Sequence, residues 1–499
     1  MTLSAANVNQ YSLSKLMKGF ANAPEMFISG ITSDSRKVKS GFLFLACKGI
    51  NNHGIDYVKE AAKAGASAVA WDSSTSIAPN KTDITLVAVD NLFQHLGEIA
   101  NRFYKNPSHD LNTIGITGTN GKTTTAWLLK QCLNYVGDCC AYIGTLGSGI
   151  DELTDNQGMT TPAAIELHNT LSQFVQNGAK SAVIEVSSHA LSQGRVNGVQ
   201  FDVGIFTNLT QDHLDYHGDM QKYFDVKSKL FLEHNPKIKI INVDSRYGLK
   251  LIKQCSHNAI IVSSNPETVV NKNPFVIIKS VQMNYQGSEV FFSSSWGEGE
   301  LKIPLPGSFN IENAAIVLAY LLANGINLNK ACDALNSVKA PSGRMQKLQT
   351  NERTIYVDYA HTPNALESAL KALRPNCLGK LWCVFGCGGD RDTGKRPLMA
   401  KIAEQYADNI VITSDNPREE NPISIIKDIL NGIKNKNIVK VIEDRALAIN
   451  WVISNSNKND LILIAGKGHE NYQEINGERQ PFSDTVQANF AVKSLRKIK

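Results

Sequence analysis

The sequence contains no long apolar run, no repeat and no low-complexity tract. No stretch approaches the ~20 consecutive apolar residues that a membrane-spanning helix needs. The first residues include neither a basic segment nor an apolar segment of the kind found in secretory signal peptides, so we expect no export. These absences favour a globular protein without a membrane span.

Cysteine is sparse, and its spacing favours neither metal nor disulfide chemistry. The nine cysteines include no CxxC pair, and Cys383 and Cys387 flank a glycine-rich turn without a histidine at metal-binding spacing. We interpret all nine as reduced, mostly buried thiols in a cytoplasm. Charge is nearly balanced as well, with 51 basic and 46 acidic residues and a net charge of +5. That surplus is too small to indicate a nucleic-acid partner, and no lysine- or arginine-rich block supports one.

The length of 499 residues exceeds what one hydrophobic core supports and predicts roughly three domains. Short β-branched stretches alternate with amphipathic helical stretches, which favours an α/β fold whose parallel sheets are covered on both faces. We predict a small N-terminal α/β domain over 1–108, a central parallel-sheet ATPase domain over 109–338 and a doubly wound, Rossmann-like domain over 339–499. A β-hairpin is expected between 275 and 292, around Gln286.

The strongest chemical signal lies in residues 113–125. We expect a buried strand ending at Ile116, a glycine-rich turn, and a helix whose first turns begin at Ala126. Backbone N–H groups in such a turn, next to a helix N-terminus, suit phosphate. Lys122 would add a positive charge at the β- and γ-phosphates, and Thr123 a hydroxyl for Mg²⁺. The alternative is a glycine-rich turn without a ligand, but the strand-loop-helix context favours phosphate.

Three other positions carry groups that suit chemistry near a metal. Glu185 lies inside an otherwise apolar strand, where a carboxylate needs a partner; it could hold Mg²⁺, or form a buried ion pair with lysine or arginine. His213 lies in a segment with two histidines and two aspartates and could bind a second divalent ion, unless the segment is only a hydrogen-bonded loop. Lys227 is expected on a helix starting near Tyr223, where a lysine usually faces solvent. Only burial near metal and phosphate would give it a chemical role.

Two polar clusters follow predicted strands in the last predicted domain. One is a glycine-rich turn that ends in Asp390, Arg391 and Asp392, and the other is the segment 415–418, which follows a strand ending at Thr413. Open parallel sheets bind ligands at the carboxyl ends of their strands. An arginine beside an Asn-Pro turn suits a carboxylate ligand. The alternative for each cluster is an exposed polar loop.

Taken together, these segments resemble the Mur ligases, the ATP-dependent amino-acid ligases of bacterial cell-wall precursor synthesis. The resemblance covers nearly the whole chain and rests on segments that occur in the family's order. These segments are 117–124, 185–189, 207–215, 307–315, 342–344, 358–363 and 465–470. The glycine-rich loop departs from the standard P-loop spacing in the way that this family's loop does.

Within the family, the resemblance is closest to the members that add the third residue of the peptide. The Asp-Asn-Pro-Arg sequence at 415–418 is the signature of the diaminopimelate-adding members. meso-Diaminopimelate is lysine with an extra carboxylate, and Arg418 can bind that group through two hydrogen bonds. The amino-acid site implied by the resemblance consists of Arg391, Asp415, Asn416, Pro417, Arg418, Gly466 and Glu470.

The resemblance also implies sites for two nucleotides. UDP-N-acetylmuramoyl-L-alanyl-D-glutamate would contact Ser33, Ser35, Ile50, Asn51, Asn52, Thr160, Thr161, Ser187, Gln193 and Arg195. ATP would contact Gly118, Thr119, Asn120, Gly121, Lys122, Thr123, Thr124, Asn310, Arg344, Asp358 and His361. On their own, the polar segments 33–36 and 49–54 are ordinary turn sequences. Met159 stands where many relatives have asparagine.

By the same resemblance, Lys227 matches the family's carbamylated lysine. Addition of CO₂ turns its ammonium into an anion, which explains how a lysine can lie beside a metal and phosphate. The implied catalytic residues are Lys122, Lys227, Glu185 and His213, and the implied Mg²⁺ ligands are Thr123, Glu185, His213 and Lys227. In the implied reaction, the D-glutamate carboxylate attacks the γ-phosphate to give an acyl phosphate and ADP. The diaminopimelate amine then displaces phosphate.

Three rival interpretations stay open at this stage. They are a lysine-adding homologue, a ligase similar to folylpolyglutamate synthase, and a nucleotide-gated switch protein that forms no bond. The segments 33–36 and 415–418 argue against the second, and a switch would need no amino-acid site. We therefore expect only small-molecule partners, namely the UDP-linked substrate, meso-diaminopimelate and ATP, and we expect a monomer.

Overall fold

The computed structural model describes residues 10–49, 52–79, 83–156, 158–255, 259–268, 272–284, 287–348, 350 and 353–495. Contacts divide the chain into two compact units. The first unit consists of Met1–Thr117, Gly137–Ile205 and Gln221–Lys239, and the second of Gly118–Val136, Phe206–Met220 and Ile240–Lys499. Both units are α/β, as predicted, whereas the proposed boundaries near 108 and 338 stay a prediction. Across the described ranges, no helix is long and apolar enough to cross a membrane.

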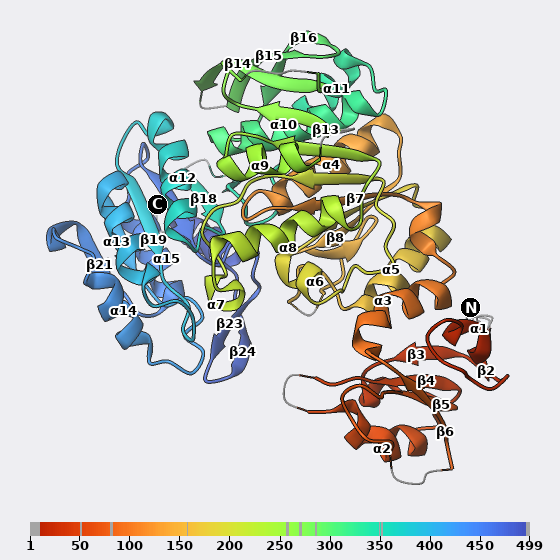
Figure 1. The fold of residues 1–499 in the computed structure, drawn as a ribbon. Coiled ribbons are helices and arrows are strands. Elements are labelled where there is room, and N and C mark those ends of the chain that lie inside the picture. Colours follow the sequence, from red (N-terminus) through yellow and green to blue (C-terminus); the bar gives the residue numbers. More distant parts are fainter. Residues whose placement is uncertain are drawn as a thin grey trace, which may run out of the picture. The chain divides into compact units, whose positions relative to one another are not determined.

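The first unit begins with a four-stranded parallel sheet covered by helices on both faces (Figure 1). Its strands, in spatial order, are β3 (Gly30–Thr32), β4 (Phe42–Ala46), β5 (Ala68–Asp72) and β6 (Thr85–Val89). The surrounding elements are β1 (Tyr11–Ser12), α1 (Leu13–Met17), β2 (Phe27–Ile28), α2 (Val58–Lys63) and α3 (Leu92–Phe103). Leu43 and Leu45 pack into a core shared with α1 and α3, while Phe44 packs with α2 on the other face. This period-two alternation follows from strand geometry.

The first unit also contains five adjacent strands that carry Glu185 at a strand end. In spatial order they are β11 (Val203–Phe206), β7 (Asn112–Thr117), β10 (Ser181–Glu185), β8 (Cys140–Gly144) and β9 (Gly147–Gly149). β10 runs parallel to both β7 and β8, and β9 is antiparallel to β8. The accompanying helices are α5 (Ala164–Gln176), α6 (Ser188–Ser192) and α8 (Met220–Leu232).

The second unit begins with the glycine-rich loop and α4 (Lys122–Val136). The predicted start of this helix at Ala126 is wrong, because the helix begins at Lys122 and the Thr125 N–H already donates to the Gly121 carbonyl. The run of threonines hid this first turn, since β-branched residues have low helix propensity.

The predicted hairpin is confirmed, although Gln286 lies outside the described residues. β14 (Phe275–Asn284) pairs antiparallel with β15 (Gly287–Ser294), and an unpredicted third strand, β16 (Gly297–Ile303), extends the sheet. The neighbouring strands are β12 (Ile238–Asn242) and β13 (Ala259–Ser263), and the helices are α7 (Leu214–His217), α9 (Arg246–Gln254), α10 (Ser308–Ala323) and α11 (Leu328–Asn336).

A six-stranded sheet forms the core of the C-terminal part of the second unit. In spatial order its strands are β17 (Gln346–Leu348), β18 (Thr354–Asp358), β22 (Leu461–Ala465), β19 (Leu381–Phe385), β20 (Asn409–Ile412) and β21 (Val439–Val441). Only the pairing of β17 with β18 is antiparallel. The helices are α12 (Pro363–Leu373), α13 (Lys395–Tyr406), α14 (Pro422–Leu430), α15 (Arg445–Asn455) and α16 (Asp484–Leu495), and β23 (Tyr472–Ile475) and β24 (Glu478–Pro481) form a separate hairpin.

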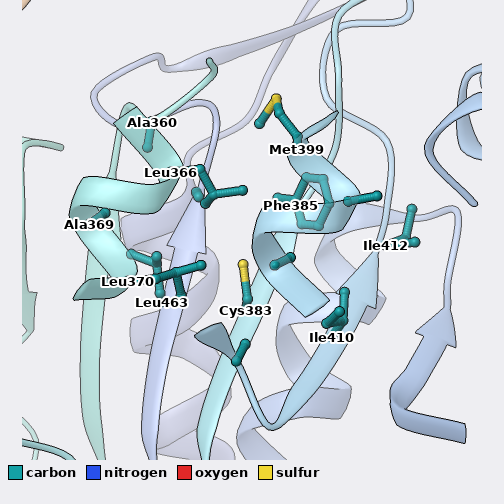
Figure 2. Close-up of a cluster of buried hydrophobic side chains, with 14 of the residues drawn as sticks. Ala360, Leu366, Ala369, Leu370, Cys383, Phe385, Met399, Ile410, Ile412 and Leu463 are labelled. Atoms are coloured by element: carbon teal, nitrogen blue, oxygen red, sulfur yellow. The ribbon is translucent and has the colours of Figure 1, made fainter. Parts of the chain in front are cut away.

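Helices cover both faces of this sheet, so the part is doubly wound as predicted. Cys383 and Phe385 of β19 face Leu366 and Met399 from α12 and α13 (Figure 2). Val384, between them, belongs to a second core with residues of α15 and α16. All nine cysteines are free, six of them buried, which confirms the expectation of reduced and mostly buried thiols. The polar segments that follow β18, β19, β20 and β22 leave the carboxyl edge of the sheet, where ligands of such sheets bind.

Candidate active site

The glycine-rich loop before α4 is built around two glycines whose positive φ angles and close neighbours disfavour any side chain. Gly118 (φ 151°) and Gly121 (φ 85°) have positive φ angles. A Cβ on Gly118 would lie 1.9 Å from the Thr207 hydroxyl, and one on Gly121 would lie 2.5 Å from Asn313 Oδ1. The loop is therefore packed tightly against its neighbours, which is the close approach for which glycine is needed.

Polar side chains hold this loop open in a fixed shape. The Asn120 N–H donates to Asn208 Oδ1 (2.9 Å), and the Thr207 hydroxyl donates to the Asn120 carbonyl (2.6 Å). Lys122 Nζ donates to the carbonyls of Gly118 (2.8 Å) and Thr119 (2.9 Å). The lysine thus curls back over the loop, where its charge would meet a bound phosphate. Thr119 and Thr124 belong to the same loop and first helical turn.

Residues 344–361 bring a second group of predicted nucleotide contacts together. Arg344 Nη2 donates to the Thr123 hydroxyl (3.5 Å), and its guanidinium lies 4.4 Å from the centre of the Tyr359 ring. Asp358 is half-buried and accepts from the N–H groups of Met345 (2.6 Å) and Ala360 (2.9 Å). Burial raises the pKa of Asp358, while Arg344 acts to lower it.

Two further predicted ATP contacts lie beside these groups. Burial lowers the pKa of His361, and nearby Lys395 lowers it further. Asn310, on α10, is 2% exposed and donates from Nδ2 to the Pro306 carbonyl (2.7 Å). Asn313, one turn later, accepts from the Thr125 hydroxyl (3.1 Å), so α10 contacts the first turn of α4.

In the first unit, the buried carboxylate of Glu185 is held by neutral donors. Glu185 has no exposed surface and accepts hydrogen bonds from the Tyr142 hydroxyl, the Thr145 N–H (3.1 Å) and the Thr145 hydroxyl (3.1 Å). A Cβ on Gly144 would lie 2.2 Å from Glu185 Oε1. These three donors are neutral, and a carboxylate is the kind of oxygen ligand that Mg²⁺ binds.

Several residues predicted for the UDP-linked substrate lie around the end of the same strand. The Thr161 hydroxyl donates to the Glu185 carbonyl (2.7 Å) and accepts from the Ser187 N–H (3.1 Å). Arg195 donates to the Thr161 carbonyl (3.0 Å) and to Gln193 Oε1 (2.6 Å). Thr160 shares a hydrogen bond with the Thr145 hydroxyl (3.2 Å). The structure thus joins Thr160, Thr161, Ser187, Gln193 and Arg195 into one polar network.

The remaining predicted substrate contacts lie in the N-terminal sheet region. Ser33 and Asn52 are exposed and Ser35 is half-buried at the start of a short 3₁₀ turn. Asp34 caps this turn and pairs with Arg36 (2.9 Å). The predicted contacts Ile50 and Asn51 lie outside the described residues.

Lys227 and His213 have contrasting surroundings. Lys227, on α8, is 1% exposed and lies 4.8 Å from the centre of the Tyr223 ring, so it does not face solvent. His213 has a side chain that is 46% exposed, a positive φ of 52° and an Asp212 carboxylate 3.4 Å away. No group of three or more His, Cys, Asp or Glu arranged to hold a metal occurs in the described parts of the chain.

At the carboxyl edge of the C-terminal sheet, three polar side chains form a compact network. Asn416 Nδ2 donates to Glu470 Oε2 (2.9 Å), and Lys467 Nζ donates both to Glu470 Oε2 (2.9 Å) and to Asn416 Oδ1 (2.8 Å). Asn416 is 3% exposed and Lys467 is fully buried. The network joins the segments that follow β20 and β22.

Arg418 is held beside this network by two other segments. Its backbone N–H and C=O pair with Glu474 and Asn476 of the β23–β24 hairpin, at a positive φ of 53°. Nη1 donates to the Gly389 carbonyl (2.8 Å), and Nε lies 3.9 Å from Glu474 Oε2. The side chain remains 21% exposed, so part of the guanidinium faces solvent.

The other predicted amino-acid contacts surround this arginine. A Cβ on Gly466 (φ 115°) would lie 2.4 Å from Asp415 Oδ2, so glycine lets the two segments meet. The exposed Arg391 donates from Nη1 to the Asp390 carbonyl (3.2 Å). Pro417 precedes Arg418, and its carbonyl would lie 1.9 Å from a Cβ on Gly389. The structure therefore brings the two strand-end clusters together, as predicted from their positions.

Lys467 and Glu474 also contact these groups, although the sequence did not predict that they would. Lys467 lies within a segment already noted, between two glycines after a strand, and this position was a usable signal. Glu474 had no such signal, because it lies in a hairpin that the pattern of residues did not predict.

Three family models match the chain: "Mur ligase family, catalytic domain" at 27–104, "Mur ligase middle domain" at 116–321 and "Mur ligase, glutamate ligase domain" at 343–468. Together with the fold and the glycine-rich loop, these matches show that the chain belongs to the Mur ligase family.

Its relatives include UDP-N-acetylmuramoyl-L-alanyl-D-glutamate--2,6-diaminopimelate ligases. The one from Coxiella burnetii is 44% identical over 489 residues, covering 97% of this chain and 100% of the relative. The one from Haemophilus influenzae (strain Rd) is 43% identical over 483 residues, covering 94% and 98%. A solved structure of a ligase with the same name is 34% identical, with a TM-score of 0.70 and coverage of 98% and 99%. A folylpolyglutamate synthase from Mycobacterium tuberculosis, at 16% identity and a TM-score of 0.62, shares the fold alone and covers 81% of this chain.

Proposed function

We propose that this chain is an ATP-dependent ligase that adds meso-2,6-diaminopimelate to UDP-N-acetylmuramoyl-L-alanyl-D-glutamate, a step of peptidoglycan precursor synthesis. The observation that carries the proposal is the position of Arg418, two residues after the Asn416 side chain that donates to Glu470, in a chain that resembles diaminopimelate ligases along its whole length. ATP and the UDP-linked substrate are metabolites of the cytoplasm, so we propose that the reaction takes place there. We also propose that the enzyme acts as a monomer.

In the proposed amino-acid site, one carboxylate and one guanidinium each keep an atom that makes no hydrogen bond within the described residues. Within the described residues, Glu470 Oε1 accepts no hydrogen bond, and Arg418 Nη2 donates none. A carboxylate oxygen suits the ammonium of an amino acid, and a guanidinium edge suits a carboxylate. Diaminopimelate carries two ammonium–carboxylate ends, whereas lysine lacks the second carboxylate. The free edge of Arg418 therefore favours diaminopimelate over lysine.

The phosphate loop supports the first half of the reaction. The N–H groups at the start of α4 and the charge of Lys122 would bind the β- and γ-phosphates of ATP. Attack by the D-glutamate carboxylate on the γ-phosphate brings two anions together, so positive charge is required as the acyl phosphate forms. The neutral amine of the amino acid then attacks the acyl carbon. The C–N bond of the amide forms, the C–O bond to phosphate breaks with its electron pair leaving on inorganic phosphate, and the amine nitrogen loses a proton to solvent.

In the proposal, Mg²⁺ would be held by Thr123, Glu185 and His213. The hydroxyl of Thr123 and the carboxylate of Glu185 are oxygen donors, which Mg²⁺ prefers, and His213 would add an imidazole nitrogen. Few protein ligands are needed, because Mg²⁺ keeps several waters and binds substrate phosphates. When bound, the ion would neutralise charge that develops on the phosphates.

Carbamylated Lys227 is the fourth metal-binding residue in the proposal. Its burial at 1% exposure excludes an ordinary solvated lysine, and a buried ammonium beside a metal would be repelled. Reaction of the neutral amine with CO₂ releases one proton and leaves a carbamate anion. Lys227→Ala should be nearly inactive, and acetate should partly restore it by replacing the lost anion. A ligand-bound crystal structure of the active enzyme with unmodified Lys227 would contradict this role.

The function is tested by incubating the purified protein with ATP, Mg²⁺ and the UDP-linked dipeptide, with diaminopimelate or lysine in separate reactions. We expect ADP release that depends on diaminopimelate, and a nucleotide product heavier by one diaminopimelate residue. A folate substrate with glutamate serves as the control for the folylpolyglutamate-synthase alternative. ADP release without any amino-acid dependence would instead support a nucleotide switch.

A further inference from the structure

Lys467 is the most deeply buried lysine of the amino-acid site, and the proposed function gives it no role. It follows β22, and its side chain has no exposed surface. Its ammonium donates to Asn416 Oδ1 (2.8 Å) and to Glu470 Oε2 (2.9 Å), and lies 5.5 Å from the centre of the Tyr472 ring. A buried ammonium is costly unless it is paired and hydrogen-bonded, so these contacts are what stabilises the charge of Lys467 inside the protein.

The first partner of Lys467 is the carboxylate that faces the ligand. Glu470 Oε2 receives hydrogen bonds from both Lys467 and Asn416, whereas Oε1 has no partner in the described part of the chain. The side chain is 16% exposed. Fixing one oxygen fixes the direction of the other, so Lys467 and Asn416 together orient Glu470 Oε1.

The second partner is the amide of Asn416. Its Oδ1 accepts from Lys467 and from the Glu474 N–H (3.0 Å), while its Nδ2 donates to Glu470. Because an ammonium can only donate, Lys467 decides which end of the amide points toward Glu470. Through the Asn416 amide, Lys467 therefore connects three parts of the chain: the segment after β20, the segment after β22 and the start of β23.

The other charged groups at this edge have protein partners of their own. Arg418 Nε lies 3.9 Å from Glu474 Oε2, and Arg445 pairs with the buried Asp484 (2.7 Å) and is also attracted by Asp415. Lys467 is therefore the cation that is hydrogen-bonded to Glu470.

We propose that Lys467 is a positioning residue of the amino-acid site, which acts through Glu470 and Asn416 to orient the carboxylate that binds the ammonium of the incoming amino acid. This inference rests on the proposed function, because it names how that site recognises its amino acid. Lys467 touches no substrate in the proposal, and its effect is carried by Glu470.

A double-mutant cycle separates positioning from general stability. The variants are Lys467→Met, Glu470→Gln and the double variant, with Lys458→Met as a control at an exposed lysine that precedes the same strand. The readouts are the KM for diaminopimelate, the KM for ATP, and Tm. Lys467→Gln, which keeps one donor without charge, replaces Lys467→Met if the latter does not fold.

Each single variant should raise the KM for diaminopimelate on the order of ten- to 100-fold, with the KM for ATP within about twofold. The double variant should have a KM for diaminopimelate less than about threefold above that of Glu470→Gln alone, because residue 470 then no longer carries the charge that Lys467 positions. Independent, multiplicative effects, or equal changes in both KM values, would overturn the proposal. If native protein shows no diaminopimelate-dependent ADP release, the proposed function fails; if it does and the cycle is multiplicative, only the role of Lys467 fails.

Discussion

The glycine-rich loop, proposed to bind phosphate, and the proposed amino-acid site are built in opposite ways. The loop is one contiguous stretch in which backbone groups and two positive-φ glycines provide the shape, with a single lysine folded over its carbonyls. The proposed amino-acid site draws polar groups from four segments, around Gly389, Asn416, Lys467 and Glu474. Hydrogen bonds join these segments, and those of Arg418, Lys467 and Glu470 are charge-assisted. A backbone site recognises phosphate in any nucleotide, whereas a side-chain site can be changed residue by residue to suit one amino acid.

The largest effect is expected in the loop. Lys122→Ala removes the only side-chain charge that the loop places over its carbonyls, so ADP formation should fall by at least about 100-fold. The measurement is ADP release at saturating substrates, with Tm to verify folding. Lys253→Ala, at an exposed lysine, is the control. Near-native turnover of folded Lys122→Ala would remove the assignment of this loop to ATP.

The next effect is expected at Arg418. A charge-assisted, bidentate contact contributes on the order of 1.5–3 kcal/mol, so Arg418→Ala should raise the KM for diaminopimelate by roughly 10- to 150-fold. The KM for ATP should change little, and lysine activity need not appear, because removing a guanidinium does not build a lysine pocket. Arg374→Ala, which breaks an ion pair with Asp408 in the same region, is the matched control. Unaltered diaminopimelate kinetics would contradict the role of Arg418.

Glu312, on α10, has a carboxylate that differs from that of Glu470. Lys467 pairs with Glu470, whereas Glu312 forms no ion pair within the described residues. Burial and the nearby Asp244 raise the pKa of Glu312 to about 7, from 4.5. The folded state then binds this proton more tightly than the unfolded state does. Proton binding by Glu312 therefore adds fully to the free energy of unfolding below about pH 4.5, and this contribution is lost as pH rises through about 7.

Glu312→Gln should therefore stabilise the protein at pH 8 by about 1–2 kcal/mol, below the limit of about 3 kcal/mol that the full shift would give. The Tm difference between pH 5.5 and pH 8 should shrink in the variant. Thermal unfolding at both pH values measures this, with Glu298→Gln, at an exposed position of β16, as the control. A pH dependence equal to that of the native protein would contradict the raised pKa.

The smallest effect is expected at Glu474. Its carboxylate lies 3.9 Å from Arg418 Nε, so Arg418 keeps a protein partner when a ligand without the second carboxylate binds. In Glu474→Gln, Arg418 loses this carboxylate and has a charged partner only when the ligand supplies a second carboxylate. The preference for diaminopimelate over lysine should therefore widen by about two- to fivefold. The ratio of kcat/KM values measures this. A narrower preference would show that Glu474 helps diaminopimelate bind.

The two sites also differ in how far sequence could predict them. The glycine-rich loop could be predicted because its residues are contiguous and phosphate binding depends on the order of strand, glycine-rich turn and helix along the chain. The start of the helix was nevertheless predicted one turn too late. The four segments of the amino-acid site could be located at strand ends and were assigned by resemblance. Their connections could not be predicted, because the Lys467–Asn416 hydrogen bond joins residues 51 positions apart. The hairpin that supplies Glu474 is held by backbone pairing with Arg418 rather than by any pattern of its own.

The central claim is that the C-terminal site selects an amino acid with a second carboxylate and couples it to ATP use. It is tested most directly by comparing kcat/KM for meso-diaminopimelate and lysine in ADP release by the native protein, with ATP and the UDP-linked dipeptide saturating. A preference for diaminopimelate of at least about tenfold is expected from the contact with Arg418. Equal use of the two amino acids would contradict the claim.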